Sequence, residues 1–340
     1  MANASAIAIR HTGLVTSVGL SAPTSCAAIR AKVTNPSETR FIDSAGESIM
    51  AHEVPLEKPW RGLAKLARMA AMAIDECLTG IPREHWSAIP LLLCVAERDR
   101  PGRLEGLEDR LFREVEQALG RSFATESGII AHGRVSAAVA LLQARRLIHE
   151  RNISRVLIAA TDSLLTWPTL SHYERSERLL TKRNSNGFMP GEGAGAILLT
   201  RPGATPELRC TGIAFGTEKA HIDSGQPLRG DGLTTAIKDA LGDAGCQLHD
   251  LDLRITDLSG EQYYFKEAAL ALSRVLRQRK EDFQLWHPAE CVGELGAAAG
   301  IACLSMACAA GAKGFAPGSG TMLHMASDNG ARAAVVTYSG

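Results

Sequence analysis

The chain has 340 residues, of which 45% are hydrophobic and 22% charged, and this balance excludes a wholly disordered protein. Lys plus Arg equal Asp plus Glu at 37 each, so no net field attracts nucleic acid or an anionic membrane surface. The start of the chain carries no leader-like pattern and no apolar run is long enough to span a bilayer. We therefore expect a cytoplasmic protein that binds neither nucleic acid nor membrane.

Strand and helix patterns alternate through the first 200 residues. Apolar runs bounded by polar residues predict strands at residues 6–10, 89–95, 155–160 and 196–200. Apolar or small residues with helical spacing predict helices at residues 21–31, 62–78, 107–120 and 136–148. Residues 98–106 are polar and suggest a surface excursion. Residues 166–186 are long and charge-rich, which suggests a capping loop or a segment that faces a partner.

The second half of the chain repeats the alternation. Strands are predicted at residues 209–214, 251–255 and 333–338, and helices at residues 233–241, 266–276 and 296–310. Pro and Gly in residues 202–206 interrupt both kinds of element, which places a boundary between residues 1–201 and residues 207–340. Alternation in both halves predicts a layered α/β protein.

The eight cysteines show no metal-ligand spacing and no C-x-x-C pair. His287 and Glu290 precede Cys291, but they are too few for a metal site. We expect no metal and no cofactor, and most thiols buried and reduced. The cysteines are Cys26, Cys77, Cys94, Cys210, Cys246, Cys291, Cys303 and Cys308.

Three Gly-rich motifs stand in an informative order. Asn186-Gly-Phe-Met-Pro-Gly-Glu-Gly-Ala-Gly195 resembles the D-G-F-x-x-G-E-G-A-G segment of the β-ketoacyl-acyl-carrier-protein synthases, and residues 12–19 and 293–300 resemble the family's N-terminal glycine loop and its G-H-x-x-G-A-A-G motif. The resemblance implies a thiolase-like fold with two pseudo-repeated halves in an α-β-α-β-α arrangement. We interpret the glycines as sites of tight turns and close packing rather than of phosphate binding.

The segment that should carry the nucleophile lacks one. Members of this family condense through a cysteine thiolate placed just before the buried central helix. No Cys occurs between Cys94 and Cys210, and the matching position is Arg134, or His132 if the loop shifts. Ser136 and Thr125 are nearby hydroxyls, although the sequence shows no base to activate them.

The other catalytic positions of the family are also replaced. Its two histidines match Leu258, within Asp257-Leu-Ser-Gly260, and Glu294 or the adjacent Gly293. Its lysine before the second histidine has no counterpart, and its oxyanion loop is matched by residues 327–330, which contain Asp328. Because a carboxylate disfavours a developing oxyanion, we predict that condensation does not occur.

A charged cluster can replace the lost site if the fold brings these loops together. The predicted members are His132, Arg134, Ser136, Glu294 and Asp328. One interpretation is a pocket in which Arg134 clamps a ligand carboxylate, and the other is an ion-paired plug in a disused cavity. His221 and Asp223 belong instead to an expected surface loop, and Trp167 and Tyr173 begin a stretch that is either a partner surface or a solvated face.

Three functions follow from the resemblance. The preferred one is a non-catalytic partner subunit, comparable to a chain-length factor, in a homodimer or in a heterodimer with an active ketosynthase, with acyl carrier protein as a further candidate partner. The second is an acyltransferase or hydrolase with a remodelled site that uses Ser136. The third is an adaptor in a specialised bacterial system such as secretion.

Overall fold

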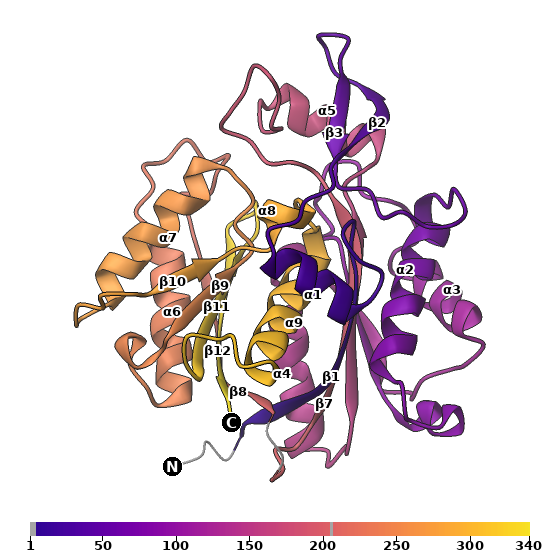
Figure 1. Ribbon diagram of the computed structural model, residues 1–340, viewed down its shortest axis with the longest axis vertical. Helices are drawn as coiled ribbons and strands as arrows, with labels where there is room; N and C mark the ends of the chain where they lie inside the picture. Colours follow the sequence, from indigo (N-terminus) through magenta and orange to yellow (C-terminus); the bar gives the residue numbers. More distant parts are fainter. Residues whose placement is uncertain (1–4, 205–206) are drawn as a thin grey trace.

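A computed structural model describes residues 5–204 and 207–340 (Figure 1). The strands are β1 (Ile7–Val15), β2 (Ser37–Ile42), β3 (Ser48–Ala51), β4 (Leu91–Val95), β5 (Gly128–Ala131), β6 (Val156–Ser163), β7 (Glu192–Thr200), β8 (Leu208–Thr217), β9 (Leu253–Thr256), β10 (Gln284–Trp286), β11 (Gly320–Ala326) and β12 (Ala331–Ser339). The α-helices are α1 (Ala22–Arg30), α2 (Gly62–Cys77), α3 (Arg110–Leu119), α4 (Ser136–His149), α5 (Trp167–Arg175), α6 (Asp231–Ala244), α7 (Gln262–Val275), α8 (Ala289–Val292) and α9 (Ala299–Ala312). Short 3₁₀ turns include η2 (Gly133–Val135) and η4 (Gly296–Ala298).

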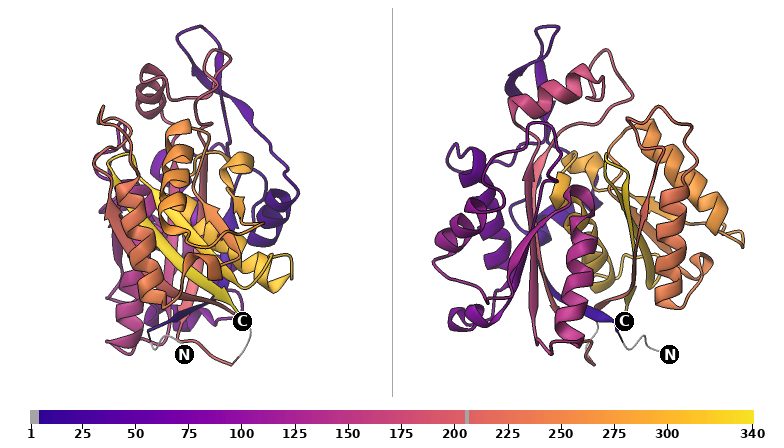
Figure 2. Two further views of the ribbon diagram at one scale, coloured as in Figure 1. Left: turned by 90° about the vertical axis from the view of Figure 1, so that its left-hand side faces the viewer. Right: turned by 180° about the vertical axis from the view of Figure 1, so that it is seen from behind.

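The strands other than β2 and β3 form one sheet with the order β10-β9-β11-β12-β8-β1-β7-β6-β4-β5. The central strand β1 is antiparallel to both β7 and β8, which joins the two halves of the chain. Figures 1 and 2 show α2 and α3 on one outer side, α4 and α9 in the middle, and α6 and α7 on the other outer side. This layering confirms the predicted fold class.

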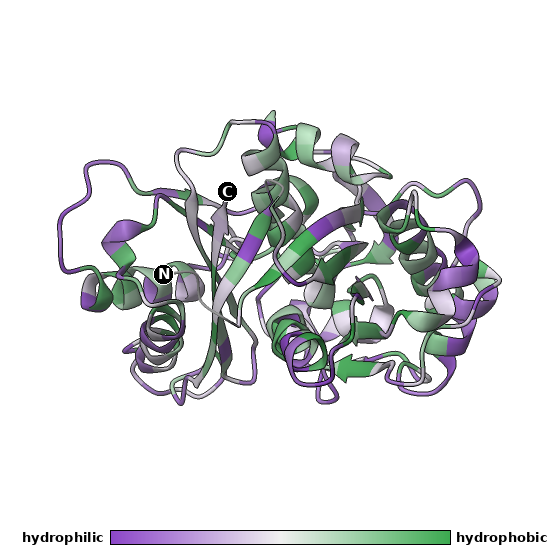
Figure 3. Ribbon diagram, turned by 90° about the horizontal axis from the view of Figure 1, so that it is seen from below, coloured by the Kyte–Doolittle hydropathy of each residue, from purple (hydrophilic) through white to green (hydrophobic). Residues whose placement is uncertain are grey.

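The two middle helices are largely buried because small and apolar residues predominate in them, although α4 also carries the exposed Gln143 and Arg146. Ten residues of α9 are buried, and they pack with α4 and the inner strands in one cluster. Figure 3 shows the same division, with hydrophobic residues in the strands and inner helices and hydrophilic residues in the peripheral segments. A helix that is apolar on nearly every side belongs in a core, as predicted for residues 136–148.

Two glycines explain why the resemblance motifs lie in strands rather than in turns. A Cβ on Gly13 would lie 2.0 Å from the carbonyl oxygen of Ala73, so α2 rests directly on β1. A Cβ on Gly195 would lie 2.6 Å from a methyl carbon of Ile301 on α9. β1 continues to Val15, through the first part of the glycine loop of residues 12–19, and β7 begins at Glu192. Close packing is the role of both glycines, since a side chain would separate the layers.

Every predicted strand and helix overlaps an element of the structure, but several elements of the structure were not predicted. The structure adds the hairpin β2–β3, the strands β5, β10 and β11, and the helices α5 and α8. The hairpin and α5 project together from the body at the top of Figure 1. We call them the cap, defined as residues 37–51 and 166–188. The predicted boundary at residues 202–206 falls partly outside the described residues, because Thr205 and Pro206 are not described, and it stays a prediction.

No helix in the described part of the chain combines the length and apolarity needed to cross a bilayer. The same residues contain no group of three or more His, Cys, Asp or Glu arranged around a common metal position.

Candidate functional site

Arg134 lies in η2, immediately before α4, and its guanidinium is almost completely enclosed by polar partners. Nη1 donates to Glu294 at 3.1 Å, and Nη2 donates to Asp328 at 2.5 Å and to the hydroxyl of Tyr264 at 2.7 Å. The guanidinium also lies 4.6 Å from the centre of the Tyr264 ring. The side chain is only 9% exposed. Arg134 is therefore fixed by internal contacts on several sides.

Asp328, in the turn between β11 and β12, connects Arg134 to the cap. Its carboxylate accepts hydrogen bonds from Arg178 at 2.8 and 3.1 Å and from Tyr173 at 3.1 Å, in addition to those from Arg134 and Tyr264. Burial alone would raise the pKa of Asp328, but Arg134 and Arg178 hold that pKa well below its usual range. The two guanidinium groups thus favour the ionised form of this carboxylate.

Asp257 follows β9 directly and faces Arg134, although the resemblance matches the next residue, Leu258, to the family's first histidine. Asp257 Oδ2 lies 4.0 Å from Arg134 Nε and accepts a hydrogen bond from the backbone of Ala326 at 2.9 Å. Leu258 instead packs in the apolar cluster beneath α6 and α7. Successive side chains at the end of a strand point to opposite faces, so a shift of one residue moves a side chain from the site to the core.

Glu294 completes the cluster from the loop before η4. Its Oε2 accepts from Arg134, and its Oε1 accepts from the backbone of Gly296 at 2.9 Å. Arg134, Asp257 and Glu294 therefore meet at one place, and the resemblance matches Arg134 and Glu294 to the family's cysteine and second histidine. We call Arg134, Asp257, Glu294, Asp328 and Tyr264 the ionic cluster.

A second layer of buried ion pairs surrounds the ionic cluster. Arg178 holds Glu261 through two hydrogen bonds of 2.7 and 2.8 Å. Arg100 bonds Asp162 at 2.6 Å and Glu97 at 2.6 and 3.0 Å. Residues 98–106 were expected to be a surface excursion, and for Arg100 this is wrong because its side chain is buried. One carboxylate partner, Glu97, is three residues away, and the other, Asp162, comes from a segment 62 residues along the chain that the sequence pattern does not connect.

The space between these groups is about 10 Å³. A cavity of this size holds about one water molecule. Within the surrounding shell, the three guanidinium groups of Arg100, Arg134 and Arg178 face six carboxylates, namely Glu97, Asp162, Asp257, Glu261, Glu294 and Asp328. A ligand carboxylate would not fit in this cavity, and the excess of carboxylates around it would repel the ligand's negative charge.

The remaining predicted site residues do not join the ionic cluster. The hydroxyl of Ser136 is fully buried, accepts from the backbone of His132 at 3.0 Å and lies 3.2 Å from the carbonyl oxygen of Ile130. It fixes the turn into α4 and has no neighbouring base. Contacts described for His132 involve its backbone. Cys303 on α9 is buried, and burial together with Asp257 and Glu294 raises the pKa of its thiol, so it is a poor thiolate nucleophile.

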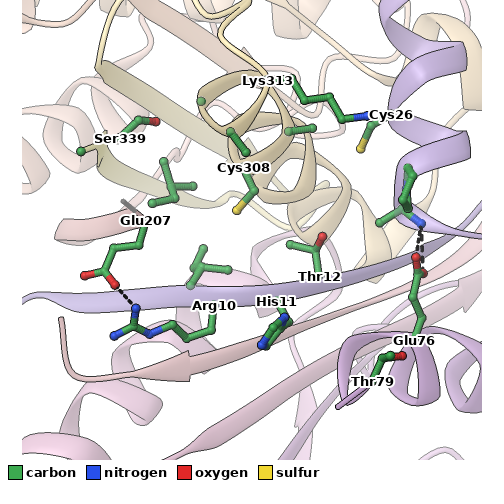
Figure 4. Close-up of a pocket in the computed structure, with 18 residues that line it drawn as sticks. Arg10, His11, Thr12, Cys26, Glu76, Thr79, Glu207, Cys308, Lys313 and Ser339 are labelled. Carbon is green, nitrogen blue, oxygen red and sulfur yellow. Dashed lines mark hydrogen bonds and ion pairs between the residues drawn. The ribbon is translucent and has the colours of Figure 1, made fainter. Parts of the chain in front are cut away.

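A much larger cavity lies elsewhere, near the end of the chain (Figure 4). It measures about 740 Å³ and is lined by residues of β1, α1 and the C-terminal end of α9. Arg10 and Glu207 form an ion pair at its edge, and Glu76 accepts hydrogen bonds from the backbone of Ala22 at 2.8 and 3.0 Å. The ionic cluster adjoins the opposite end of α9, about 20 Å away along the helix axis. This cavity is therefore separate from the ionic cluster.

The titration of Asp257 gives a prediction about pH. Burial raises the pKa of Asp257 from 3.8 to about 7, with Arg134 opposing the rise and Glu294 adding to it. Between those values the folded chain binds a proton that the unfolded chain has released, so this residue makes stability fall as the pH rises from about 4 to about 7. Asp257→Asn should remove that part of the slope. Urea unfolding of both proteins at pH 5, 6, 7 and 8 measures it, and parallel curves would contradict the assignment.

Comparison with known proteins gives matches in structure only. No protein-family model matches the sequence, and no curated protein matches it significantly. The ishigamide ketosynthase/chain length factor superposes with a TM-score of 0.81 at 15% identity, over 98% of each chain. The ketosynthase ApeO in complex with its chain length factor ApeC from Xenorhabdus doucetiae gives 0.77 at 13% identity, again over 98% of each chain. AntDE:AntF, a ketosynthase in complex with its acyl-carrier protein, gives 0.78 at 15% identity and the same coverage. These matches establish the fold.

Proposed function

Because the chain has the thiolase-like fold of ketosynthases and chain length factors, with charged residues where a ketosynthase needs its catalytic groups, we propose that it is a non-catalytic partner subunit. It acts by association, as a chain-length factor acts beside an active ketosynthase. The observation that carries this proposal is that Arg134, at the position matched to the family's cysteine, pairs with Glu294 at 3.1 Å and lies 4.0 Å from Asp257. The charged groups of this set pair with one another, and the cavity that remains between them has a volume of about 10 Å³.

The ionic cluster supports a structural plug rather than a ligand pocket. Arg134 uses both Nη atoms on internal acceptors, and the family's oxyanion loop is matched by a turn whose carboxylate is ionised. Chemistry based on Ser136 lacks support, since its hydroxyl is buried among backbone groups with no base beside it. An adaptor role would also work by association, and the identity of the partner separates it from a chain-length-factor role.

The sheet has a free edge that suits a partner subunit. β5 lies at the end of the ten-stranded sheet, paired with β4 alone, and Ile129 on it is half-buried. A Cβ on Gly128 would meet no atom within 4 Å. An unpaired edge strand presents hydrogen-bonding groups that another strand can complete. We propose that β5 pairs with the same strand of a second copy or of a ketosynthase.

Ile129→Lys tests this edge. Lysine on an edge strand opposes strand pairing, while its aliphatic stem can still cover the apolar surface beside it. We expect the unaltered protein to elute as a dimer, alone or with a co-expressed ketosynthase from the same locus, and the variant to elute as a monomer. Light scattering gives the masses, and circular dichroism shows whether the variant is folded. A folded variant that remains dimeric would exclude β5 as the interface.

Co-purification tests the function itself. The tagged protein is expressed from its own genomic locus, and the captured proteins are identified by mass spectrometry. Recovery of a ketosynthase with an intact Cys-His-His set in equal amount supports the proposal. Recovery of secretion components would favour the adaptor role, and a chain that remains a monomer without a partner would contradict both.

A further inference from the structure

A second cavity lies under the cap, about 440 Å³ in volume, and it differs in chemistry from the ionic cluster. Its walls include three aromatic side chains, Phe41, Trp60 and Trp167. Trp60 is 38% exposed and Trp167 is 49% exposed, whereas Trp86 is buried in the core. Exposed tryptophan beside a concave surface is characteristic of a binding site, because the ring remains in water until a ligand covers it.

The aromatic wall is ordered by stacking between the hairpin and α5. The rings of Phe41 and Trp167 are stacked with centroids 6.3 Å apart and an angle of 22° between their planes. The guanidinium of Arg40 lies 4.9 Å from the centre of the Phe41 ring on the same strand. Glu174 on α5 accepts a hydrogen bond from the backbone of Ser44 at 2.5 Å, which ties the hairpin to the helix. The wall is therefore held in place before any ligand binds.

The charges around this cavity favour an anion. Three cations line it, Arg40, Arg61 and Lys65, against two carboxylates, Glu53 and Glu192. Lys65 occupies both carboxylates, at 2.9 Å from Glu53 and 2.5 Å from Glu192. The ion pairs found among residues 5–204 and 207–340 leave Arg40 and Arg61 at the cavity without a carboxylate. One positive charge is thus in excess at the mouth of the cavity.

We propose that this cavity binds a small planar ligand with one anionic group, such as an aryl carboxylate. Its volume lies in the usual range for small-molecule sites, which are mainly apolar with a few placed polar groups. The ring would lie against Trp167 and Trp60, and the carboxylate would accept hydrogen bonds from Arg61. The hairpin of the cap forms a two-stranded sheet of its own, whereas β5 lies at the edge of the ten-stranded sheet.

The test uses 2-naphthoate as the probe and the full chain. Isothermal titration should show saturable binding at one site, and 2-naphthalenemethanol, which lacks the charge, should bind at least about tenfold more weakly. Trp167→Ala and Arg61→Gln should each lower the affinity for 2-naphthoate by about tenfold. Trp286→Phe is the matched control, because Trp286 stacks on Phe315 at another surface, and it should leave the affinity unchanged.

Each result has a definite meaning. Equal affinity for the acid and the alcohol would overturn the anionic part of the proposal. Binding that survives Trp167→Ala in a variant with an unchanged circular dichroism spectrum would overturn the location. Absence of saturable binding up to millimolar 2-naphthoate would overturn the site.

Discussion

Arg134→Met should lower the free energy of unfolding by about 3–5 kcal/mol, because it leaves buried carboxylates without their cation. Asp328 retains Arg178, but Glu294 and Asp257 lose the guanidinium that both face. Methionine fills a similar volume, so the loss reports the missing charge and hydrogen bonds more than an empty space. Urea unfolding at pH 7.5 measures the change.

Two further variants separate this effect from a general loss of arginine. Arg98→Met removes the ion pair with Glu108, in which the Arg98 side chain is 80% exposed, and it should cost less than about 1 kcal/mol. In the Arg134→Met background, Glu294→Gln should recover part of the stability, because the unpaired buried charge is removed. If Arg134→Met lowers the free energy of unfolding by less than about 1 kcal/mol, the ionic cluster does not stabilise the folded chain in the way proposed.

The fold could be predicted from the sequence because short glycine motifs and runs of apolar residues mark positions where few other residues fit. Gly13 lies against the backbone of α2 and Gly195 against the side chain of Ile301, so a larger residue fits at neither position and the motifs around them are recognisable. Helix α9 was predicted because its run of small apolar residues favours a helix that packs on most of its sides. The strands β5 and β10 were missed because each is short, four and three residues long, and gives no periodic pattern.

The candidate site was predictable only in part. Arg134, Glu294 and Asp328 each follow a motif whose place in the fold was recognised, and the structure brings all three together. Tyr264 and Arg178 were missed as members because their segments, a helix start and a charge-rich loop, carry no motif. They contact Asp328 across 64 and 150 residues of sequence, and no rule based on local sequence predicts contacts between residues so far apart in the chain.

Asp257 was not among the residues predicted for the site, whereas its neighbour Leu258 was. A charged residue directly after a buried strand was a usable signal, because burial of an unpaired carboxylate is costly and requires a partner. Residues 253–256 form the parallel partner of β11, which fixes Asp257 beside the turn that carries Asp328. Strand register therefore decides which of two adjacent side chains enters the site.

The unaltered chain should form no acyl-enzyme with an acyl thioester and no condensation product with a malonyl thioester. It lacks a thiol at the end of η2, and the groups facing that position are carboxylates rather than imidazoles. Arg134→Cys alone should also fail, because Asp257, Glu294 and Asp328 would raise the pKa of the new thiol and stabilise no developing negative charge. Intact-protein mass spectrometry after incubation with octanoyl-CoA detects the adduct.

Arg134→Cys/Asp257→His/Glu294→His should be the first variant to accept the acyl group. The two histidines replace two carboxylates and supply hydrogen-bond donors for the thioester. Positioned acid–base groups of this kind raise reaction rates by about 100-fold or more. The matched control is Arg134→Cys/Leu258→His/Glu294→His, which follows the sequence alignment but places its first imidazole in the apolar core. Acylation of the first triple variant at least about tenfold faster than the second supports the position assigned to Asp257. Adduct formation by the unaltered chain would instead show a nucleophile outside the ionic cluster and overturn the non-catalytic assignment.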